Sequence, residues 1–295
     1  MRPWVPSLVI DSAALRPIVR FGVQFQLKHV IGSLSGAMAP VYAGRTLGQR
    51  QLGFINWGQS TAFFPLRLVE IMARVSFPLY SRLQSDRQAF ARSLERAVVV
   101  SAMGTLFFVG MGFGLGPSLV RVVYGEKWVP ALPIFYVYAA GIAVGFLHPV
   151  VAPALDALGK PQVNVRLTIS WTAAICLLVV LMTPIWGAVG FAIGYCLPMV
   201  VGNIVVIVIL KQLVPDARLW PRTRAFIIGA LTVWAVGRFA LSPWVTGPLS
   251  FSLSVVASAV LFLGVVGVLD RSAIVEILVL AGRRKPAAET GLPST

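Results

Sequence analysis

Eight apolar segments, each about as long as a bilayer is thick, constrain this chain more than any other feature. A helix needs about 20 apolar residues to cross the hydrocarbon core, and helices can cross it in series because they satisfy their own backbone hydrogen bonds. The segments cover residues 18–43, 52–80, 97–120, 131–155, 167–184, 187–210, 225–243 and 249–269. With 57% hydrophobic and 12% charged residues, the sequence predicts an all-α, multi-pass membrane helix bundle.

The distribution of Lys and Arg predicts the orientation of this bundle. Most of the 25 basic residues fall on the N-terminal segment, the second, fourth and sixth connections, and the tail. Basic loops stay in the cytoplasm, so both termini are expected on the cytoplasmic side of the cell inner (plasma) membrane. On the other side, Trp128, Trp186 and Trp244 each mark a connection, as expected for an aromatic belt.

Composition argues against several classes of function. The net charge of +15 follows mostly from the topology rule, so the basic loops are expected to contact anionic lipid and not nucleic acid. Cys176 and Cys196 fall within apolar segments and predict neither a disulfide framework nor a metal site. No catalytic constellation is visible, His148 and Asp156 are interpreted as structural, and no cofactor is expected. The sequence therefore favours a protein that is not an enzyme.

The longer connections carry their own expectations. Residues 81–96 place apolar side chains at near-helical spacing, which predicts one amphipathic helix at the inner face, with Asp86 and Glu95 paired to nearby arginines. Residues 211–224 contain two prolines and are expected to form an extended turn. Residues 272–282 are expected to lie at the membrane interface, followed by a polar, disordered tail.

Proline and glycine are frequent within the apolar segments and include the run GMGFGLG at residues 110–116. One interpretation is close helix packing with tolerated kinks, and the general enrichment of both residues in membrane helices favours it. The other interpretation is a set of bent helices around a cavity that changes shape. The sequence leaves both open.

Charged residues inside the second segment are the strongest candidates for function. An arginine at a helix centre costs about 2.5–3.5 kcal/mol on the insertion scale, so it needs a reason to be there. On a helix, Arg74 falls about 20° from Arg67, and Glu70 falls about 60° from it, so all three share one face. Asn56 and Ser60 fall on that face too. This polar stripe is expected to face protein or water.

The first segment carries a second stripe, formed by Gln24, Lys28 and Ser35, which lie within about 40° of one another on a helix. If the two stripes face each other, they line a polar cavity whose cations attract an anion. Arginine suits phosphate because its planar fork bonds two oxygens at once.

Glu70 has two interpretations. It lies three residues from Arg67 and four from Arg74, so it can form ion pairs that hold helices together. One acid cannot neutralise both arginines and Lys28, which favours an anion-binding surface, with Glu70 as a candidate for ion coupling.

Three stretches of the chain occur in a recognisable order and spacing. They are RFGVQFQLKHVIGSLSGAMAPVYAGRTLGQRQLGFINWGQS, SFPLYSRLQSDRQAFARSL, and VRVVYGEKWVPALPIFYVYA followed by ALDALGKPQ. Over about residues 15–215 they resemble the second half of Wzx-type polysaccharide (O-antigen) flippases, members of the multidrug/oligosaccharidyl-lipid/polysaccharide exporter superfamily.

The resemblance implies a function in surface polysaccharide and lipopolysaccharide biosynthesis. Such flippases translocate oligosaccharide repeat units linked to undecaprenyl diphosphate across the bacterial inner membrane. Two six-helix lobes surround a central cationic cavity and alternate between inward- and outward-open states. Family members carry basic residues on the cavity-facing helices of the second lobe, where Lys28, Arg67 and Arg74 stand here, which implies that these residues capture the diphosphate.

The resemblance also divides the chain. It implies a cytoplasmic linker remnant at 1–17, a second-lobe six-helix bundle at 18–213, two additional helices at 214–269, and an interfacial helix with a polar tail at 270–295. The first lobe is expected to be missing, so the chain is expected to need a first-lobe partner or a second copy of itself. The other expected partners are the lipid-linked oligosaccharide, membrane lipids and a polysaccharide polymerase.

Two further functions stay open. One is a non-transporting scaffold, or an inactive truncated product, of a polysaccharide biosynthesis locus, in which the intramembrane charges would be dispensable. The other is a membrane-embedded glycosyltransferase or ligase of the same pathway. That enzyme needs acids or histidines at the membrane boundary and usually a large periplasmic loop, and no outer connection of this sequence is long enough.

Overall fold

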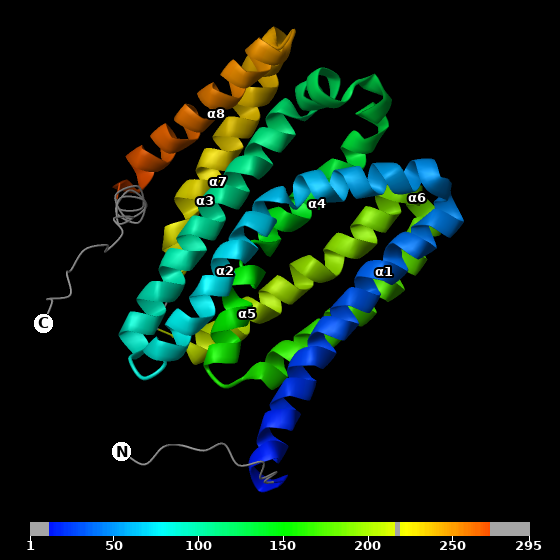
Figure 1. The fold of residues 1–295 in the computed structure, drawn as a ribbon. Coiled ribbons are helices and arrows are strands. Elements are labelled where there is room, and N and C mark those ends of the chain that lie inside the picture. The colour runs from blue at the N-terminus through cyan, green and yellow to red at the C-terminus, as the bar shows by residue number, and fades with distance from the viewer. Residues whose placement is uncertain (1–11, 216–218, 272–295) are drawn as a thin grey trace, which may run out of the picture.

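The computed structural model describes residues 12–215 and 219–271, and in these residues every regular element is a helix (Figure 1). The α-helices are α1 (Ser12–Ala62), α2 (Phe64–Leu83), α3 (Arg87–Leu119), α4 (Leu132–Gly145), α5 (His148–Ala157), α6 (Pro161–Leu213), α7 (Leu219–Val236) and α8 (Pro248–Leu269). Short π and 3-10 turns at Val120–Tyr124, Glu126–Ala131, Gly237–Leu241 and Ser242–Trp244 join them at one end. The all-α class predicted from the sequence is confirmed.

The two longest helices each reverse direction once, so each holds more than one predicted segment (Figure 1). In α1 the reversal lies at Gly48, with φ of 79°, and in α6 it lies at Trp186 and Gly187, the glycine having φ of 58°. These left-handed values suit glycine, which has no Cβ to clash. The first arm of α1 contains segment 18–43, and the two arms of α6 contain 167–184 and 187–210.

Two predicted segments are broken midway. Segment 52–80 divides between α1 and α2 at Phe63, and segment 131–155 divides between α4 and α5 at residues 146–147. Pro65 and Pro149 each stand in the first turn of the helix that follows, where the missing N–H has no intrahelical acceptor to lose. The broken helices run alongside each other, because α1 packs on α4 and α2 packs on α5.

Five stretches of the described residues are long and apolar enough to cross a membrane. They are Arg87–Tyr124, Glu126–Ala157, Pro161–Leu213, Thr223–Trp244 and Pro248–Leu269. These five hold six of the predicted segments, because Pro161–Leu213 holds two. The segments at 18–43 and 52–80 lie in α1 and α2 instead, so the total of eight spans and the cytoplasmic position of both termini stay predictions.

The glycine run 110–116 lets α3 approach helices on two sides. Gly110 and Gly114 face α7, where a methyl group added to Gly114 would lie 3.1 Å from the carbonyl oxygen of Trp234. Gly112 and Gly116 face α4, where an added methyl group would lie 2.7 Å from the Phe135 ring and 3.1 Å from the Tyr136 hydroxyl. In α3, therefore, these glycines serve close helix packing.

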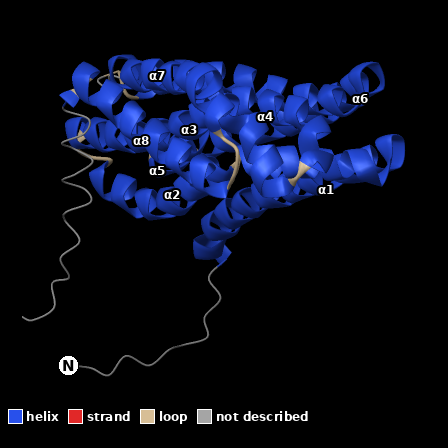
Figure 2. Ribbon diagram, turned by 90° about the horizontal axis from the view of Figure 1, so that it is seen from above, coloured by secondary structure: helices blue, strands red, loops and turns tan. Residues whose placement is uncertain are grey.

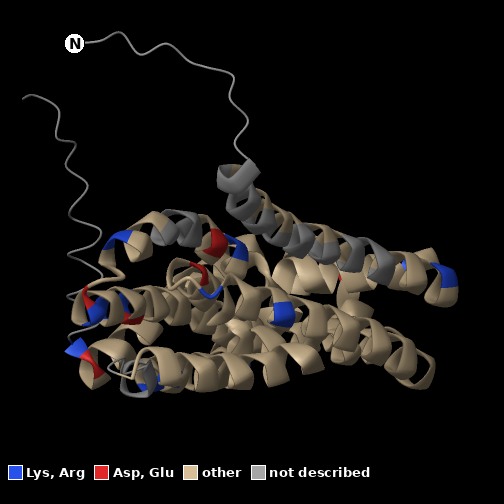
Figure 3. Cartoon of the chain, turned by 90° about the horizontal axis from the view of Figure 1, so that it is seen from below, with Lys and Arg blue, Asp and Glu red and all other residues tan. Residues whose placement is uncertain are grey.

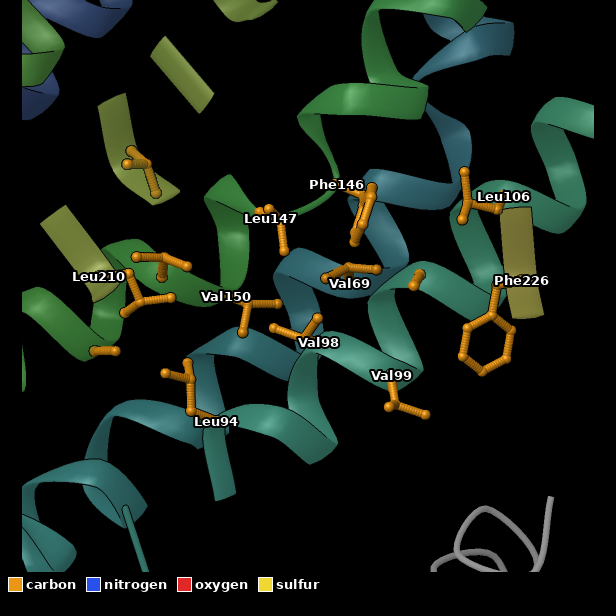
Figure 4. Close-up of a cluster of buried hydrophobic side chains, with 14 of the residues drawn as sticks. Val69, Leu94, Val98, Val99, Leu106, Phe146, Leu147, Val150, Leu210 and Phe226 are labelled. Carbon is orange, nitrogen blue, oxygen red and sulfur yellow. The ribbon is translucent and has the colours of Figure 1, made fainter. Parts of the chain in front are cut away.

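A buried apolar cluster joins α2, α3, α5, α6, α7 and α8. Figure 4 shows side chains from several helices converging there, among them Val98, Phe146 and Leu210. A second cluster joins the second arm of α1 to α4 and α6. In Figure 2, α1 lies at one side of the bundle and α7 and α8 lie at the other. In the described part of the chain, charged residues gather mainly near helix ends, with long uncharged stretches between them (Figure 3).

Two predicted connections need correction. Residues 81–96 do not form one amphipathic helix: α2 ends at Leu83 and α3 begins at Arg87. The carboxylate of Asp86 accepts hydrogen bonds from the backbone N–H of Gln88 and Ala89, 3.1 and 3.0 Å away, so Asp86 starts a new helix as its N-cap. The turn expected over 211–224 is shorter, since α6 runs to Leu213 and α7 begins at Leu219. Residues 272–282 and the tail lie outside the described residues.

Candidate functional site

A polar pocket of about 300 Å³ lies where the two arms of α1 meet α2 and α6. We call it the charged pocket. It is lined by Gly36, Pro40, Ile55, Asn56, Gln59, Phe63, Leu66, Arg67, Glu70, Phe191 and Tyr195. Gln59 from α1 and Tyr195 from α6 both contribute to this lining.

The break between α1 and α2 sets the direction of the charged residues. Phe63, at the break, packs edge-on against Tyr138 and Tyr195, with ring centroids 5.9 and 6.1 Å away. The backbone N–H of Arg67 donates to the carbonyl of Phe63 at 3.2 Å, so α2 continues directly from this anchor. Arg67 and Glu70 then stand one helical turn apart on one face.

This face of α2 is open to the pocket, whereas its other face is packed. Arg67 and Glu70 are exposed, but Val69, which does not line the pocket, is buried at 7% exposure. Among the residues that the structure describes, no ion pair joins Arg67 to Glu70. A guanidinium or a carboxylate in a largely apolar segment needs a polar partner, water or a bound group for its solvation.

The predicted site residues are only partly within the described structure. Arg67, Glu70 and Asn56 line the charged pocket together. Ser60 lines a neighbouring pocket, to which Asn56 also contributes. The predicted residues whose side chains lie outside the described part of the structure are Gln24, Lys28, Ser35 and Arg74. The helices that carry them both reach the charged pocket: α1, which holds Gln24, Lys28 and Ser35, contributes Gly36 and Pro40, and α2, which holds Arg74, contributes Arg67 and Glu70.

Sequence reasoning missed Gln59 and Tyr195 as pocket residues. Helical geometry could have predicted Gln59, because it lies three residues after Asn56 and eight before Arg67. Tyr195 carries no such local signal, since it comes from α6, far away in the sequence.

The neighbouring pocket, which we call the aromatic pocket, has a volume of about 600 Å³. It is lined by Gly53, Asn56, Trp57, Ser60, Thr61, Phe64, Phe108, Met111, Leu119, Tyr124 and Trp128. Three of its rings pack together: the centroid of Trp57 lies 5.2 Å from that of Tyr124 and 5.8 Å from that of Trp128. Trp128 therefore packs within this cluster, whereas Trp186 and Trp244 expose 54% and 78% of their surface, as a belt residue would.

Two polar residues elsewhere have structural contacts. The amide of Asn164, which is buried, donates to both carboxylate oxygens of Asp156 at 3.0 and 3.1 Å, joining α5 to α6. The ring of His148 lies 5.3 Å from that of Trp171. Within residues 12–215 and 219–271, no group of three or more His, Cys, Asp or Glu residues stands together as a metal site would need.

The helix bundle, with its membrane-length apolar helices, defines a multi-pass membrane protein. A solved structure of similar fold is the lipid II flippase MurJ in its inward closed conformation, with a TM-score of 0.69. The match covers 91% of this chain and 57% of MurJ, at 11% sequence identity, so it shows the fold alone.

Sequence comparison narrows the class. The family of polysaccharide biosynthesis proteins matches residues 1–133. The lipopolysaccharide biosynthesis protein WzxC of Escherichia coli is 25% identical over 206 residues, 68% of this chain and 41% of WzxC. The teichuronic acid biosynthesis protein TuaB of Bacillus subtilis is 25% identical over 155 residues, 52% of this chain and 31% of TuaB.

The chain is therefore similar to polysaccharide biosynthesis proteins, at an identity of about 25% to the two relatives. The five membrane-length apolar stretches and the fold shared with MurJ agree with a multi-pass membrane protein. The chain spans less than half the length of either curated relative it matches.

Proposed function

We propose that this chain takes part in translocating oligosaccharide repeat units, linked to undecaprenyl diphosphate, across the inner membrane. The observation that carries the proposal is the charged pocket, where Arg67 and Glu70 are exposed at the wall of a cavity inside an apolar bundle. The names of WzxC, TuaB and MurJ, which refer to polysaccharide biosynthesis and lipid II flipping, support this direction.

In this proposal Arg67 binds the diphosphate of the lipid carrier. A guanidinium keeps its charge at any physiological pH and can bond two phosphate oxygens at once. Lys28 and Arg74 are proposed as further cations of the same site, because the sequence places Arg74 on the helical face of Arg67 and the resemblance to Wzx-type flippases implies a diphosphate-binding role for Lys28. Asn56 and Gln59 offer neutral hydrogen bonds at the pocket wall, and Glu70 is proposed to couple transport to an ion.

Translocation needs no bond to be made or broken, so the proposed role requires no catalytic group. A charged headgroup must lose its water to cross the apolar core, and fixed cations lower that cost by replacing the lost hydration. The proposal therefore describes a transporter and not an enzyme.

The test replaces Arg67 with Gln in the full protein, in a bacterial strain whose surface polysaccharide depends on the gene. A charge-assisted hydrogen bond contributes about 1.5–3 kcal/mol, so diphosphate binding should weaken about tenfold or more, and export should fall strongly. Surface polysaccharide is measured by immunoblot of whole cells, alongside the amount of the protein in the membrane. Arg67→Lys should have an intermediate effect, because it keeps the charge but not the planar fork.

Arg82→Gln is the matched control, because Arg82 is exposed near the end of the same helix and loses the same charge. It should leave export close to normal. Normal export with Arg67→Gln would contradict the proposed site and favour the scaffold role. A change in glycan structure, without a loss of surface amount, would instead favour a glycosyltransferase or ligase.

A further inference from the structure

We propose that the aromatic pocket binds the saccharide part of the lipid-linked substrate while the charged pocket holds its diphosphate. This inference rests on the proposed function and deepens it, because it assigns a place to the sugar. The aromatic pocket, at about 600 Å³, has about twice the volume of the charged pocket, at about 300 Å³. Asn56 lines both, so the two pockets adjoin at this residue.

The lining of the aromatic pocket matches the two faces of a sugar ring. A pyranose has flat apolar C–H faces and a rim of hydroxyl groups. Trp57, Tyr124 and Trp128 provide aromatic surface, while Asn56 and Ser60 provide hydrogen-bonding groups one helical turn apart. Ligand pockets generally combine a mostly apolar and aromatic wall with a few placed polar groups in this way.

The polar groups of this pocket differ from other hydroxyls of the bundle. Thr168, Thr183 and Ser258 each donate to the backbone carbonyl four residues earlier, at 2.6–2.9 Å, so their hydroxyls are satisfied within their own helix. In the part of the chain that the structure describes, the side chains of Asn56 and Ser60 make no hydrogen bond, and both are exposed to the pocket. They are therefore available to a ligand.

Trp57 adds an independent observation. Its side chain is 8% exposed, and its indole N–H is buried without a hydrogen-bond acceptor. An indole N–H usually finds a partner when it is buried, and leaving a buried donor unpaired costs about 1–3 kcal/mol. A hydroxyl-rich ligand in the adjoining pocket would supply an acceptor after a small movement of the ring cluster.

An isoprenoid chain is the competing occupant, because the pocket wall is largely apolar. It would cover Asn56, Ser60 and the Trp57 N–H without offering any of them a partner, and burying an unpaired polar group is unfavourable. A saccharide offers both the apolar contact and the hydrogen bonds. The lining therefore favours the saccharide.

The experiment measures ligand binding by the purified full chain in detergent, using quenching of tryptophan fluorescence. Four probes are titrated: a hexose joined to geraniol through diphosphate, geranyl diphosphate, geraniol, and a free disaccharide. The wild-type chain should bind the hexose-bearing probe about tenfold more tightly than geranyl diphosphate, as expected for two ordinary hydrogen bonds and one ring contact. Ser60→Ala and Tyr124→Leu should each reduce the preference for the hexose-bearing probe and leave the affinity for geranyl diphosphate unchanged.

Thr232→Val is the matched control, because its hydroxyl bonds the carbonyl of Ile228 on α7, away from the pocket. Arg67→Gln should weaken the binding of both diphosphate probes equally. If it does not, the proposed diphosphate site is wrong, whereas the proposed saccharide site is unaffected. Equal binding of the two diphosphate probes to the wild-type chain would overturn the saccharide site, and this result needs no variant to fold. Weaker geraniol binding with Tyr124→Leu would also overturn it, in favour of the isoprenoid chain. The free disaccharide, titrated in parallel, tests directly whether the aromatic pocket binds a saccharide, even if no diphosphate probe binds.

Discussion

The two sides of the bundle use polar and small residues in opposite ways. On the packed side, formed by α3 and α7, glycines bring backbones into contact and the hydroxyl of Thr232 is bonded within its own helix. On the pocket side, formed by α1 and α2, the helix is broken at Phe63, and the polar groups of Asn56 and Arg67 face open space. The contacts of the packed side and the lining of the charged pocket are thus carried by different helices, so substitutions should separate stability from diphosphate binding.

Substitutions on the packed side should destabilise the protein most. A methyl group added to Gly110 would meet the backbone of Ala230, 2.9 Å from its Cα, and backbone cannot move aside as a flexible side chain can. Overpacking of this kind costs about 1–3 kcal/mol. We expect Gly110→Ala to lower the melting temperature of the purified protein and to reduce its amount in the membrane.

Substitutions at two other glycines of α3 provide a comparison for Gly110→Ala. Gly104 has no atom within 4 Å of an added methyl group, so Gly104→Ala should be neutral or slightly stabilising, because alanine favours a helix. Gly112→Ala should fall between the two, since the methyl group would meet the tip of the Phe135 ring, a side chain that can shift. Equal melting temperatures for Gly104→Ala and Gly110→Ala would remove the contrast between the two sides.

The sequence predicted what depends on hydrophobic length and left out what depends on contacts between distant segments. The apolar segments were predictable because lipid demands a long apolar helix. The break at Phe63 was not, since Pro65 alone does not say whether a membrane helix bends or divides. The prediction of one helix over residues 81–96 was wrong because it relied on the near-helical spacing of apolar residues. It gave too little weight to Asp86, a residue type that favours the N-cap.

The site shows the same division. The shared face of Arg67, Glu70 and Asn56 followed from helical geometry, and the structure places all three around one pocket. The contribution of Tyr195 depended on how α6 packs against α1, and no local pattern contains that information. The aromatic pocket likewise joins α1 to α3 and the turns that follow it, so its lining could not be read from one segment.

The break itself gives a second prediction on the pocket side. Pro65→Ala restores a backbone N–H and allows α1 to continue into α2, which would turn Arg67 and Glu70 away from their present direction. We expect weaker binding of geranyl diphosphate, by about three- to tenfold, or about 0.6–1.4 kcal/mol, with little change in melting temperature. Pro78→Ala, in the interior of the same helix, is the control and should leave binding unchanged. Loss of stability without loss of binding would show that the break serves packing.

The smallest expected effect on stability is at Glu70, and it sharpens the comparison most directly. Glu70 is exposed at the pocket wall, whereas Glu95 on α3 is buried at 9% exposure and has an interaction partner. Glu95→Gln should therefore destabilise the protein by about 1–3 kcal/mol, because it weakens a buried polar interaction. Glu70→Gln should change stability by less than about 0.5 kcal/mol, as exposed substitutions usually do. Diphosphate binding should become slightly tighter with Glu70→Gln, because a negative charge beside the anion is removed. If Glu70→Gln instead lowers the melting temperature as much as Glu95→Gln does, the carboxylate serves to hold helices together, and the pocket side is no longer distinct from the packed side.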